Sequence, residues 1–298
     1  MKKALLIHNP GAGDEEHNEE ELIRLITSHG FECLYTSVKD KGWKDFDYDV
    51  DFLVVAGGDG TVRKVAKKLL QRKMIDKTWP IGLLPCGTAN NIAKTLHFED
   101  DTERLIKTWQ NENIQQYDVG RIENLEKADL FLESLGYGIF PYLMMEMDKR
   151  PSPKDEMPEE KLTAALELLH NIAVSYEPHE CSLTIDGVDY SGEFILLELM
   201  NTKSIGPNLF LAPDADPGDG LLEIVAVTEN NKKKFVEYIA NKLKGKEAPF
   251  DFSHFRGKNI TIRWQGTHVH VDDEVIKIEK GQEIKVELKE GLLQFLVA

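Results

Sequence analysis

The sequence has few cysteines and no long apolar run, and both shortages narrow the class of protein. Its three cysteines, Cys33, Cys86 and Cys181, lie far apart without metal-binding spacing, which indicates free thiols in a reducing compartment. No apolar segment approaches the roughly 20 residues that cross a bilayer, and the apolar residues 5–7 are too few for a signal peptide. We therefore expect a soluble, cytoplasmic protein.

Positive charge is also scarce, because 36 Lys and Arg residues stand against 52 Asp and Glu residues and the net charge is -16. A protein that binds nucleic acid needs clustered Lys and Arg to displace counterions, so we expect no nucleic-acid partner. The same total disfavours permanent attachment to an anionic membrane. With 298 residues, of which 41% are apolar, the chain is long enough for two domains with cores of their own.

The most informative stretch joins a predicted strand to a predicted helix. The apolar residues 53–56 stop at a glycine-rich turn, residues 57–61, and helical periodicity follows over residues 62–70. Glycines let the backbone approach a ligand, and the N–H groups of a first helical turn attract anions. The carboxylate of Asp59 among such amides points to a divalent cation beside a phosphate. The alternative is a plain turn in which Asp59 caps a helix.

Other strands of the first half end in similar loops. Residues 4–8 run into the Pro- and Gly-containing loop 9–13, which is either a phosphate-binding loop or an ordinary turn, and residues 31–36 follow as a second strand. Residues 81–84 run into residues 85–93, which again carry Gly-Thr and polar amides before a helix. Alternating apolar strands and helices predict a parallel sheet that binds ligands at the carboxyl ends of its strands.

The pattern changes after Gly120, where short strands with turn residues between them predict an antiparallel sandwich. The predicted strands are residues 130–135, 181–185, 193–199, 221–227, 260–264, 268–271, 275–279 and 283–288, with residues 292–297 as one more. The Met-rich stretch 137–176 is either core or part of an acyl-chain pocket. The Lys-rich helix 231–246 is either a surface helix of the sandwich or an amphipathic element that touches a membrane.

Two motifs together carry a family resemblance. Gly57-Gly58-Asp59-Gly60-Thr61, followed about 25 residues later by Pro85-Cys86-Gly87-Thr88-Ala89-Asn90, resembles the catalytic domain of the diacylglycerol kinase and sphingosine kinase superfamily, nearest to its soluble bacterial lipid kinases. The first motif alone is shared with NAD kinases and phosphofructokinases, and the pair is more specific.

The resemblance implies an ATP-dependent lipid kinase that uses Mg²⁺. It also implies an α/β nucleotide-binding domain over residues 1–122, a β-sandwich lipid-substrate domain over residues 123–288, and a C-terminal segment, residues 289–298, that packs back on the first domain. The active site is then expected in the cleft between the domains.

The resemblance also assigns roles to individual residues. Those expected to bind the nucleotide are Asn9, Pro10, Gly11, Ala12, Gly13, Thr36, Gly57, Gly58, Asp59, Gly60, Thr61, Gly87, Thr88 and Asn90. Asp59 and Asp118 are expected to organise the catalytic Mg²⁺, and the loop with Asp216, Asp219 and the carbonyl of Leu221 is expected to hold a structural Mg²⁺. Without the resemblance, an Asp-Gly turn explains that loop equally well.

The expected proton acceptor is Glu274, with Asp272 beside it and Asp59 as the third catalytic residue. Without the resemblance, an acidic hairpin turn exposed to solvent is the better interpretation of residues 271–274. Two positions depart from the family pattern. Asn91 stands where Asp is usual, which removes a charge from the magnesium network. Asp273 stands where Gly is usual, in a turn expected to need positive φ at that position, which Asp tolerates.

Two other functions remain open at this stage. One is a kinase of a soluble acceptor, similar to an NAD kinase, and the other is a catalytically silent protein that binds nucleotide or lipid. Under the lipid-kinase interpretation we expect a lipid substrate at the membrane surface and transient peripheral contact with the membrane. The sequence does not identify the lipid, and a homodimer through an exposed edge strand stays open.

Overall fold

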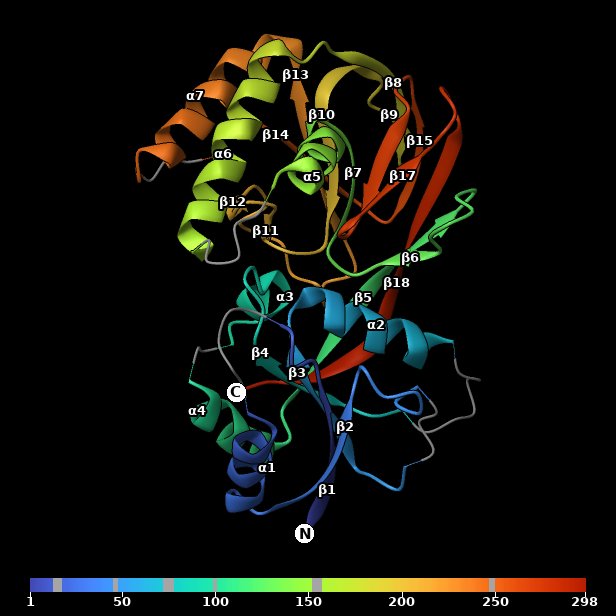
Figure 1. Ribbon diagram of the computed structural model, residues 1–298. Coiled ribbons are helices and arrows are strands. Elements are labelled where there is room, and N and C mark those ends of the chain that lie inside the picture. The colour runs from blue at the N-terminus through green and yellow to red at the C-terminus, as the bar shows by residue number, and fades with distance from the viewer. Residues whose placement is uncertain (13–17, 45–47, 72–77, 99–100, 152–156, 247–249) are drawn as a thin grey trace. The chain divides into compact units, whose positions relative to one another are not determined.

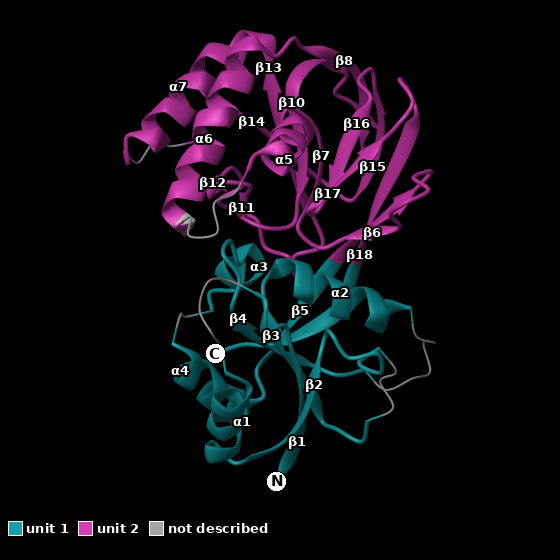
Figure 2. Cartoon of the chain, viewed as in Figure 1, with its two compact units in different colours: residues 1–118, 290–298 teal, residues 119–289 magenta. Residues whose placement is uncertain are grey.

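The structure is a computed structural model that describes residues 1–12, 18–44, 48–71, 78–98, 101–151, 157–246 and 250–298. Its contacts divide the chain into two compact units (Figure 2). Unit 1 contains Met1–Asp118 and Glu290–Ala298, and unit 2 contains Val119–Lys289. Both units take residues from the long strand β18 (Glu283–Leu296), which begins in unit 2 and ends in unit 1.

Unit 1 is built on a parallel sheet with the order β2-β1-β3-β4 (Figure 1). Its strands are β1 (Lys2–His8), β2 (Phe31–Ser37), β3 (Phe52–Gly57) and β4 (Ile81–Pro85). Beyond β4, Phe295 of β18 pairs in parallel with Ile81. The central strands are buried on both faces, as their continuous apolar sequences predict. The parallel sheet predicted from the sequence for the first domain is therefore confirmed.

The helices of unit 1 connect these strands. They are α1 (Glu19–Ser28), α2 (Asp59–Leu70), α3 (Asn91–Thr95) and α4 (Thr102–Thr108), with a short 3₁₀ turn, η1 (Trp109–Asn111), after α4. Asn18 caps α1 by accepting a hydrogen bond from the backbone of Glu20. Helix α2 begins at Asp59, three residues before the start of the helical periodicity at Val62. The glycine-rich turn is therefore shorter than the sequence suggests, and Asp59 lies in the first turn of α2.

Unit 2 is an antiparallel sandwich, as predicted. Its main sheet has the order β17-β16-β7-β10-β8-β15-β18, and β13 pairs with both β10 and β14. The strands are β5 (Ile114–Glu123), which enters from unit 1, β6 (Leu130–Phe131), β7 (Ser134–Gly138), β8 (His179–Ile185), β9 (Val188–Asp189), β10 (Gly192–Met200), β11 (Ser204–Ile205), β12 (Leu209–Phe210), β13 (Leu222–Thr228), β14 (Ser253–Gly257), β15 (Asn259–Trp264), β16 (His268–Val271) and β17 (Glu274–Lys277).

The helices of unit 2 are α5 (Ile139–Lys149), α6 (Pro158–Ser175) and α7 (Lys232–Leu243), with the 3₁₀ turn η2 (Glu229–Asn231) before α7. They cover one side of the strands and enclose an apolar cluster that includes Phe140, Leu169 and Phe235. A second cluster, with Leu197 and Trp264, fills the space between strands. The apolar residues of α5 and α7 thus belong largely to the core, which favours the structural interpretation of both stretches. None of the described helices is long and apolar enough to cross a membrane.

Two strand predictions in unit 2 are wrong. Residues 130–135 form two short strands instead of one, because the backbone amides of Leu132 and Glu133 donate to the carboxylate of Asp272. The predicted strands 283–288 and 292–297 form one continuous strand, β18, which ends at Leu296 and passes through Gly291 at a positive φ of 60°. The strand β14 was not predicted, since its residues show no clear apolar alternation.

Candidate active-site residues

The first nucleotide loop and the glycine turn after β3 are in direct contact. Asn9, which follows β1, donates from Nδ2 to Oγ1 of Thr61 at 3.0 Å, and its backbone N–H donates to the carbonyl of Ala56 at 2.9 Å. The amides of Gly11 and Ala12 donate back to the side chain and carbonyl of Asn9. Gly13 lies outside the described residues. The two loops predicted to bind phosphate therefore lie at the same end of the parallel sheet.

The second motif packs against the first through glycine. A Cβ atom on Gly87 would lie 2.4 Å from Cα of Gly58, so these backbones approach more closely than any side chain permits. Asn90 fixes the turn, because Oδ1 accepts from the amide of Gly87 at 2.9 Å and Nδ2 donates to the carbonyl of Gly87 at 2.6 Å. Asn90 itself has a positive φ of 50°. The prediction that these two strand ends meet is confirmed by the Gly58–Gly87 approach.

Asp59 connects the two motifs. Its carboxylate accepts hydrogen bonds from the backbone N–H groups of Asn91 and Ile92, at 2.9 and 3.1 Å, and so caps the start of α3. Burial raises the pKa of the Asp59 carboxyl, while the two amides and the charge of Lys94 act in the opposite direction. The alternative interpretation from the sequence, in which Asp59 caps a helix, is therefore correct in part. The helix that it caps is α3, 32 residues away, and not its own helix.

The other residues of the expected magnesium network lie on neighbouring elements of unit 1. Asn91 is buried in the first turn of α3. Asp118, at 1% exposure, lies on β5 and accepts a hydrogen bond from the amide of Gly291 at 2.7 Å. Thr36 is buried near the end of β2. Within the part of the chain that the structure describes, no three acidic, His or Cys side chains gather as a metal-binding group. Carboxylate oxygens are ligands that Mg²⁺ prefers, so the chemistry of the Asp59 and Asp118 side chains fits a cation.

The predicted proton acceptor lies on the β16–β17 hairpin of unit 2. Glu274 is exposed at the start of β17 and pairs with Val271. Asp272 is 8% exposed, and its carboxylate accepts from the backbone amides of residues 132–134 at 2.8 to 3.2 Å. Its position is thus fixed by the start of β7. The positive φ of this turn is at Asp272, at 50°, so the expectation that it falls at Asp273 is wrong.

The loop expected to hold a structural Mg²⁺ contains a different arrangement. Asp216 accepts from the amide of Gly218, and Oδ1 of Asp219 accepts from the amide of Leu221, so both carboxylates close tight turns. Oδ2 of Asp219 contacts the guanidinium of Arg256. The Nε of Arg256 lies 2.8 Å from Oε1 of Glu223, which is buried.

The guanidinium ion of Arg256 therefore already contacts the carboxylates of Asp219 in the loop and Glu223 on β13, and offsets one of their two negative charges. A divalent cation on Asp219 would have to displace Arg256 or bear its repulsion. The donor set in this arrangement does not fit the structural Mg²⁺ that the family resemblance implies.

Family models match both halves of the chain. Residues 3–122 match the model described as the diacylglycerol kinase catalytic domain. Residues 152–289 match the model described as the YegS C-terminal NAD kinase beta sandwich-like domain. The chain thus contains a region that matches a diacylglycerol kinase catalytic domain, followed by a region that matches a YegS-type β-sandwich domain.

Curated relatives of this family are similar along most of the chain. The diacylglycerol kinase of Bacillus subtilis (strain 168) is 24% identical over 307 residues, which cover 98% of this chain and 88% of the relative. The diacylglycerol kinase of Mycobacterium tuberculosis (strain ATCC 25618 / H37Rv) is 23% identical over 266 residues, which cover 86% of this chain and 79% of the relative.

Solved structures show the same fold. A crystal structure of a diacylglycerol kinase from Bacillus anthracis superposes with a TM-score of 0.72 at 23% identity and covers 100% of this chain and 97% of its own. An NAD kinase from Archaeoglobus fulgidus in complex with ATP superposes with a TM-score of 0.52 at 11% identity. The superposition covers 99% of this chain and 93% of the NAD kinase chain. Both domains thus have the fold expected from the sequence.

Sequence reasoning missed one buried polar pair in unit 2. Glu198, in the middle of β10, is 0% exposed and lies 2.9 Å from Nε2 of His270 on β16, which is 1% exposed. The available signal was a lone acidic residue within the apolar run of residues 194–200. A charged residue is almost never fully buried without a partner, so Glu198 in this run indicates a buried polar partner elsewhere in the chain.

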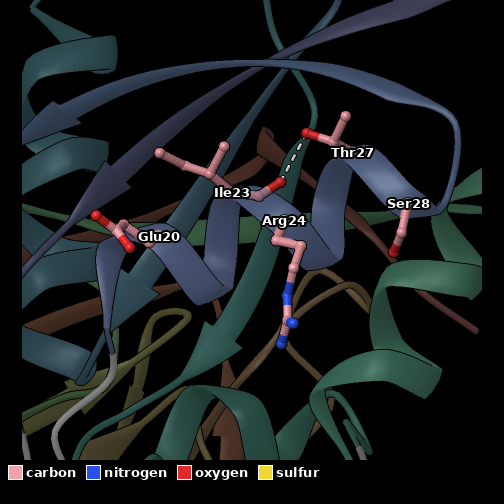
Figure 3. Close-up of a pocket in the computed structure, with 5 residues that line it drawn as sticks. All are labelled: Glu20, Ile23, Arg24, Thr27 and Ser28. Carbon is pink, nitrogen blue, oxygen red and sulfur yellow. Dashed lines mark hydrogen bonds between the residues drawn. The ribbon is translucent and has the colours of Figure 1, made fainter.

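A shallow surface depression lies apart from these residues. It has a volume of about 540 Å³ and is lined by one side of α1, namely Glu20, Ile23, Arg24, Thr27 and Ser28 (Figure 3). Thr27 Oγ1 donates to the carbonyl of Ile23 at 2.7 Å within the helix. Among the described residues that line this depression, none is a predicted site residue, and we assign it no ligand.

Proposed function

We propose that this protein is an ATP-dependent lipid kinase that transfers the γ-phosphoryl group of Mg-ATP to a lipid hydroxyl, with diacylglycerol as the first candidate. The observation that carries the proposal is the close approach of Gly58 and Gly87, which joins two glycine turns at one end of the sheet within the matched catalytic domain. Phosphoryl transfer depends on positioning and on neutralising charge, and backbone amides in such turns supply both.

Each part of the transfer then has an assigned group. The turns that contain Asn9, Gly58 and Gly87 bind and orient the phosphates. Asp59 and Asp118 bind the Mg²⁺, which when present neutralises charge on the transferred phosphoryl group. Glu274 accepts the proton of the lipid hydroxyl as its oxygen bonds to the γ-phosphorus and the bond from phosphorus to the bridging oxygen of ADP breaks.

The proposal includes a location and a mode of contact with substrate. A lipid substrate requires the enzyme to reach the membrane surface, so we propose a cytoplasmic protein with transient peripheral contact. Its net charge of -16 supports release after turnover, since anionic lipid repels an acidic protein. The proposal includes a homodimer formed through an exposed edge strand of the sandwich.

The test is transfer of radiolabel from γ-labelled ATP in the presence of Mg²⁺. Acceptors are diacylglycerol, ceramide, a sphingoid base and phosphatidylglycerol in mixed micelles, with NAD in a parallel detergent-free reaction. Label in one lipid band supports the lipid kinase and names its acceptor. Label in NAD alone replaces it with a kinase of a soluble acceptor, and ATP binding without transfer to any acceptor replaces it with a silent binding protein.

The role of Glu274 has its own test with a matched control. Glu274→Gln removes the proton acceptor, while Glu279→Gln removes an exposed glutamate from the loop directly after the same hairpin. We expect a loss of kcat on the order of 10²–10⁴-fold for the first variant and no loss for the second. Equal activity of the two variants would remove Glu274 from the mechanism.

A further inference from the structure

The buried pair of Glu198 and His270 is built across three strands of unit 2. Strand β7 lies between β10 and β16, and Gly136 on β7 is directly opposite both Glu198 and His270. Residues that are directly opposite in neighbouring strands project from the same face of the sheet. The two polar side chains therefore project from the same face on either side of a residue that has no side chain.

The absence of a side chain at Gly136 allows the pair to form. Oε2 and Oε1 of Glu198 lie 2.9 and 3.0 Å from Nε2 of His270. A Cβ atom on Gly136 would lie 2.0 Å from Oε1 of Glu198, closer than any real contact. The ring of Phe140, from α5, packs edge-on against His270 with centroids 6.3 Å apart. The pair is thus closed off from water on its helix side.

The hydrogen bonds determine where the protons are. Nδ1 of His270 lies 3.1 Å from the backbone carbonyl of Asp272, which can only accept, so Nδ1 carries a proton. One further proton is shared between Nε2 and the Glu198 carboxylate, and either position leaves the pair with no net charge. Burial lowers the pKa of His270, but the Glu198 carboxylate outweighs it and the net shift is upward, while burial raises the pKa of Glu198.

The pair is connected to the β16–β17 hairpin through the peptide group of Asp272. The Asp272 carbonyl accepts from His270, the Asp272 amide donates to the carbonyl of Ser134 at 2.8 Å, and the Asp272 carboxylate accepts from residues 132–134. Every polar group of Asp272 is therefore fixed by its surroundings. Glu274 follows two residues later, at the start of β17.

We propose that Glu198 and His270 are positioning residues that hold the Asp272 peptide and thereby set the position of Glu274. The proposal rests on the proposed function for its kinetic consequence, because Glu274 matters only if it accepts the proton of a substrate. Its structural consequence, a hairpin held by the His270 bond, does not depend on the identity of the substrate.

The first test replaces the pair by apolar side chains. Glu198→Leu with His270→Phe removes both charges, and such replacements of buried ion pairs are often neutral for stability. We expect kcat to fall on the order of 10–10²-fold, because small displacements of a catalytic group have effects of that size. The KM for ATP should stay within about 2-fold, since nucleotide residues are elsewhere.

A second, isosteric pair of variants keeps the test decisive if the apolar double variant does not fold. In Glu198→Gln with His270→Asn, the Asn amide nitrogen takes the place of Nδ1 and keeps the bond to Asp272. In Glu198→Gln with His270→Gln, the Gln amide nitrogen takes the place of Nε2 and loses that bond. The double variant with His270→Asn should retain kcat within about 3-fold. The double variant with His270→Gln should show the same fall in kcat as the apolar double variant. Equal kcat in the two overturns the proposal.

Hydrogen exchange separates this proposal from the kinase proposal. Amides of residues 271–274 should exchange faster in the apolar variant and in the Gln/Gln variant than in the wild type, with no substrate present. The control is Ile26→Val, a core change on α1 of unit 1 that lowers stability and should leave both kcat and hairpin exchange unchanged. If wild-type protein phosphorylates no acceptor, the kinase proposal fails and exchange alone decides. Unchanged hairpin exchange overturns the positioning role in either case.

Discussion

Replacing Asp59 should affect both folding and catalysis, and the two effects can be separated. The Asp59 carboxylate accepts backbone hydrogen bonds from Asn91 and Ile92 at the start of α3. Asp59→Ala leaves those two N–H groups without this acceptor. A capping residue typically contributes about 0.5–2 kcal/mol, and counted instead per amide left unpaired the cost is roughly 1–3 kcal/mol each.

The charge of Asp59 offsets part of this loss. Because burial raises its pKa, the ionised carboxylate is less stable in the folded protein than in the unfolded chain. We therefore expect a net loss of about 2 kcal/mol at neutral pH, which corresponds to a fall of roughly 5–10 °C in Tm for a unit of this size.

The pH dependence of this difference has a definite sign. A raised folded-state pKa favours the folded state below the unfolded value of 3.8, and this contribution is lost as the pH rises through the folded value. The stability advantage of the wild type over Asp59→Ala should therefore grow as the pH falls from neutral toward about 4. Thermal unfolding followed by circular dichroism across this range measures it.

The matched control for this prediction is Asp101. Its Oδ1 accepts from the amides of Glu103 and Arg104 at 3.0 and 3.2 Å and caps α4, but it is exposed and belongs to neither glycine motif. Asp101→Ala should cost about 1 kcal/mol and leave phosphoryl transfer unchanged. Asp59→Ala should lose transfer on the order of 10²-fold or more at a temperature where both variants are folded.

Two results would refute this reasoning about Asp59. A wild-type Tm for Asp59→Ala would show that the carboxylate does not hold α3. A fall in transfer no larger than that of Asp101→Ala would show that Asp59 has no part in binding the metal or phosphate.

Three further predictions follow from individual residues. Asn91→Asp should leave kcat unchanged or raise it by restoring a carboxylate near the proposed Mg²⁺; a large loss at saturating Mg²⁺ would contradict this. In the absence of nucleotide, excess EDTA should not change the Tm of the wild type, because the guanidinium of Arg256 already contacts Asp219 and Glu223, whereas Mg²⁺ should raise the Tm of Arg256→Ala. A Tm of the wild type that depends on Mg²⁺ would oppose this. Cys33, whose pKa burial raises to about 11, should react with a thiol reagent at pH 8 on the order of 10²-fold more slowly in native than in denatured protein. Equal rates would contradict that shift.

The parts of the fold that sequence reasoning predicted are those set by local pattern. Residues 53–56 are fully buried between helices, and their continuous apolar sequence showed a central parallel strand before any pairing was known. The approach of Gly58 to Gly87 also followed from the sequence, since both turns come directly after neighbouring strands of one sheet.

The parts that sequence reasoning missed depend on partners that are distant along the chain. If residues 57–61 formed only a glycine turn, the Asp59 carboxylate would have no protein partner and Asp59→Ala would fold normally. In the structure, two backbone amides of α3 donate to that carboxylate. Glu198 and His270 are 72 residues apart, and they meet only because β7 brings Gly136 between them. Strand order and register decide such contacts, and neither is visible in a local pattern.

The turn at Asp272 shows how a substitution within a motif can have little effect on the backbone. The family pattern suggested that Asp273, in place of Gly, would have a positive φ, which Asp tolerates better than most residues. In the structure the positive φ falls on Asp272, a residue type that tolerates this region and whose carboxylate is held by the amides of residues 132–134. Asp273 then needs no left-handed conformation. The same contacts that take Leu132 and Glu133 out of a regular strand therefore let this hairpin carry a third acidic side chain beside Glu274 without backbone strain.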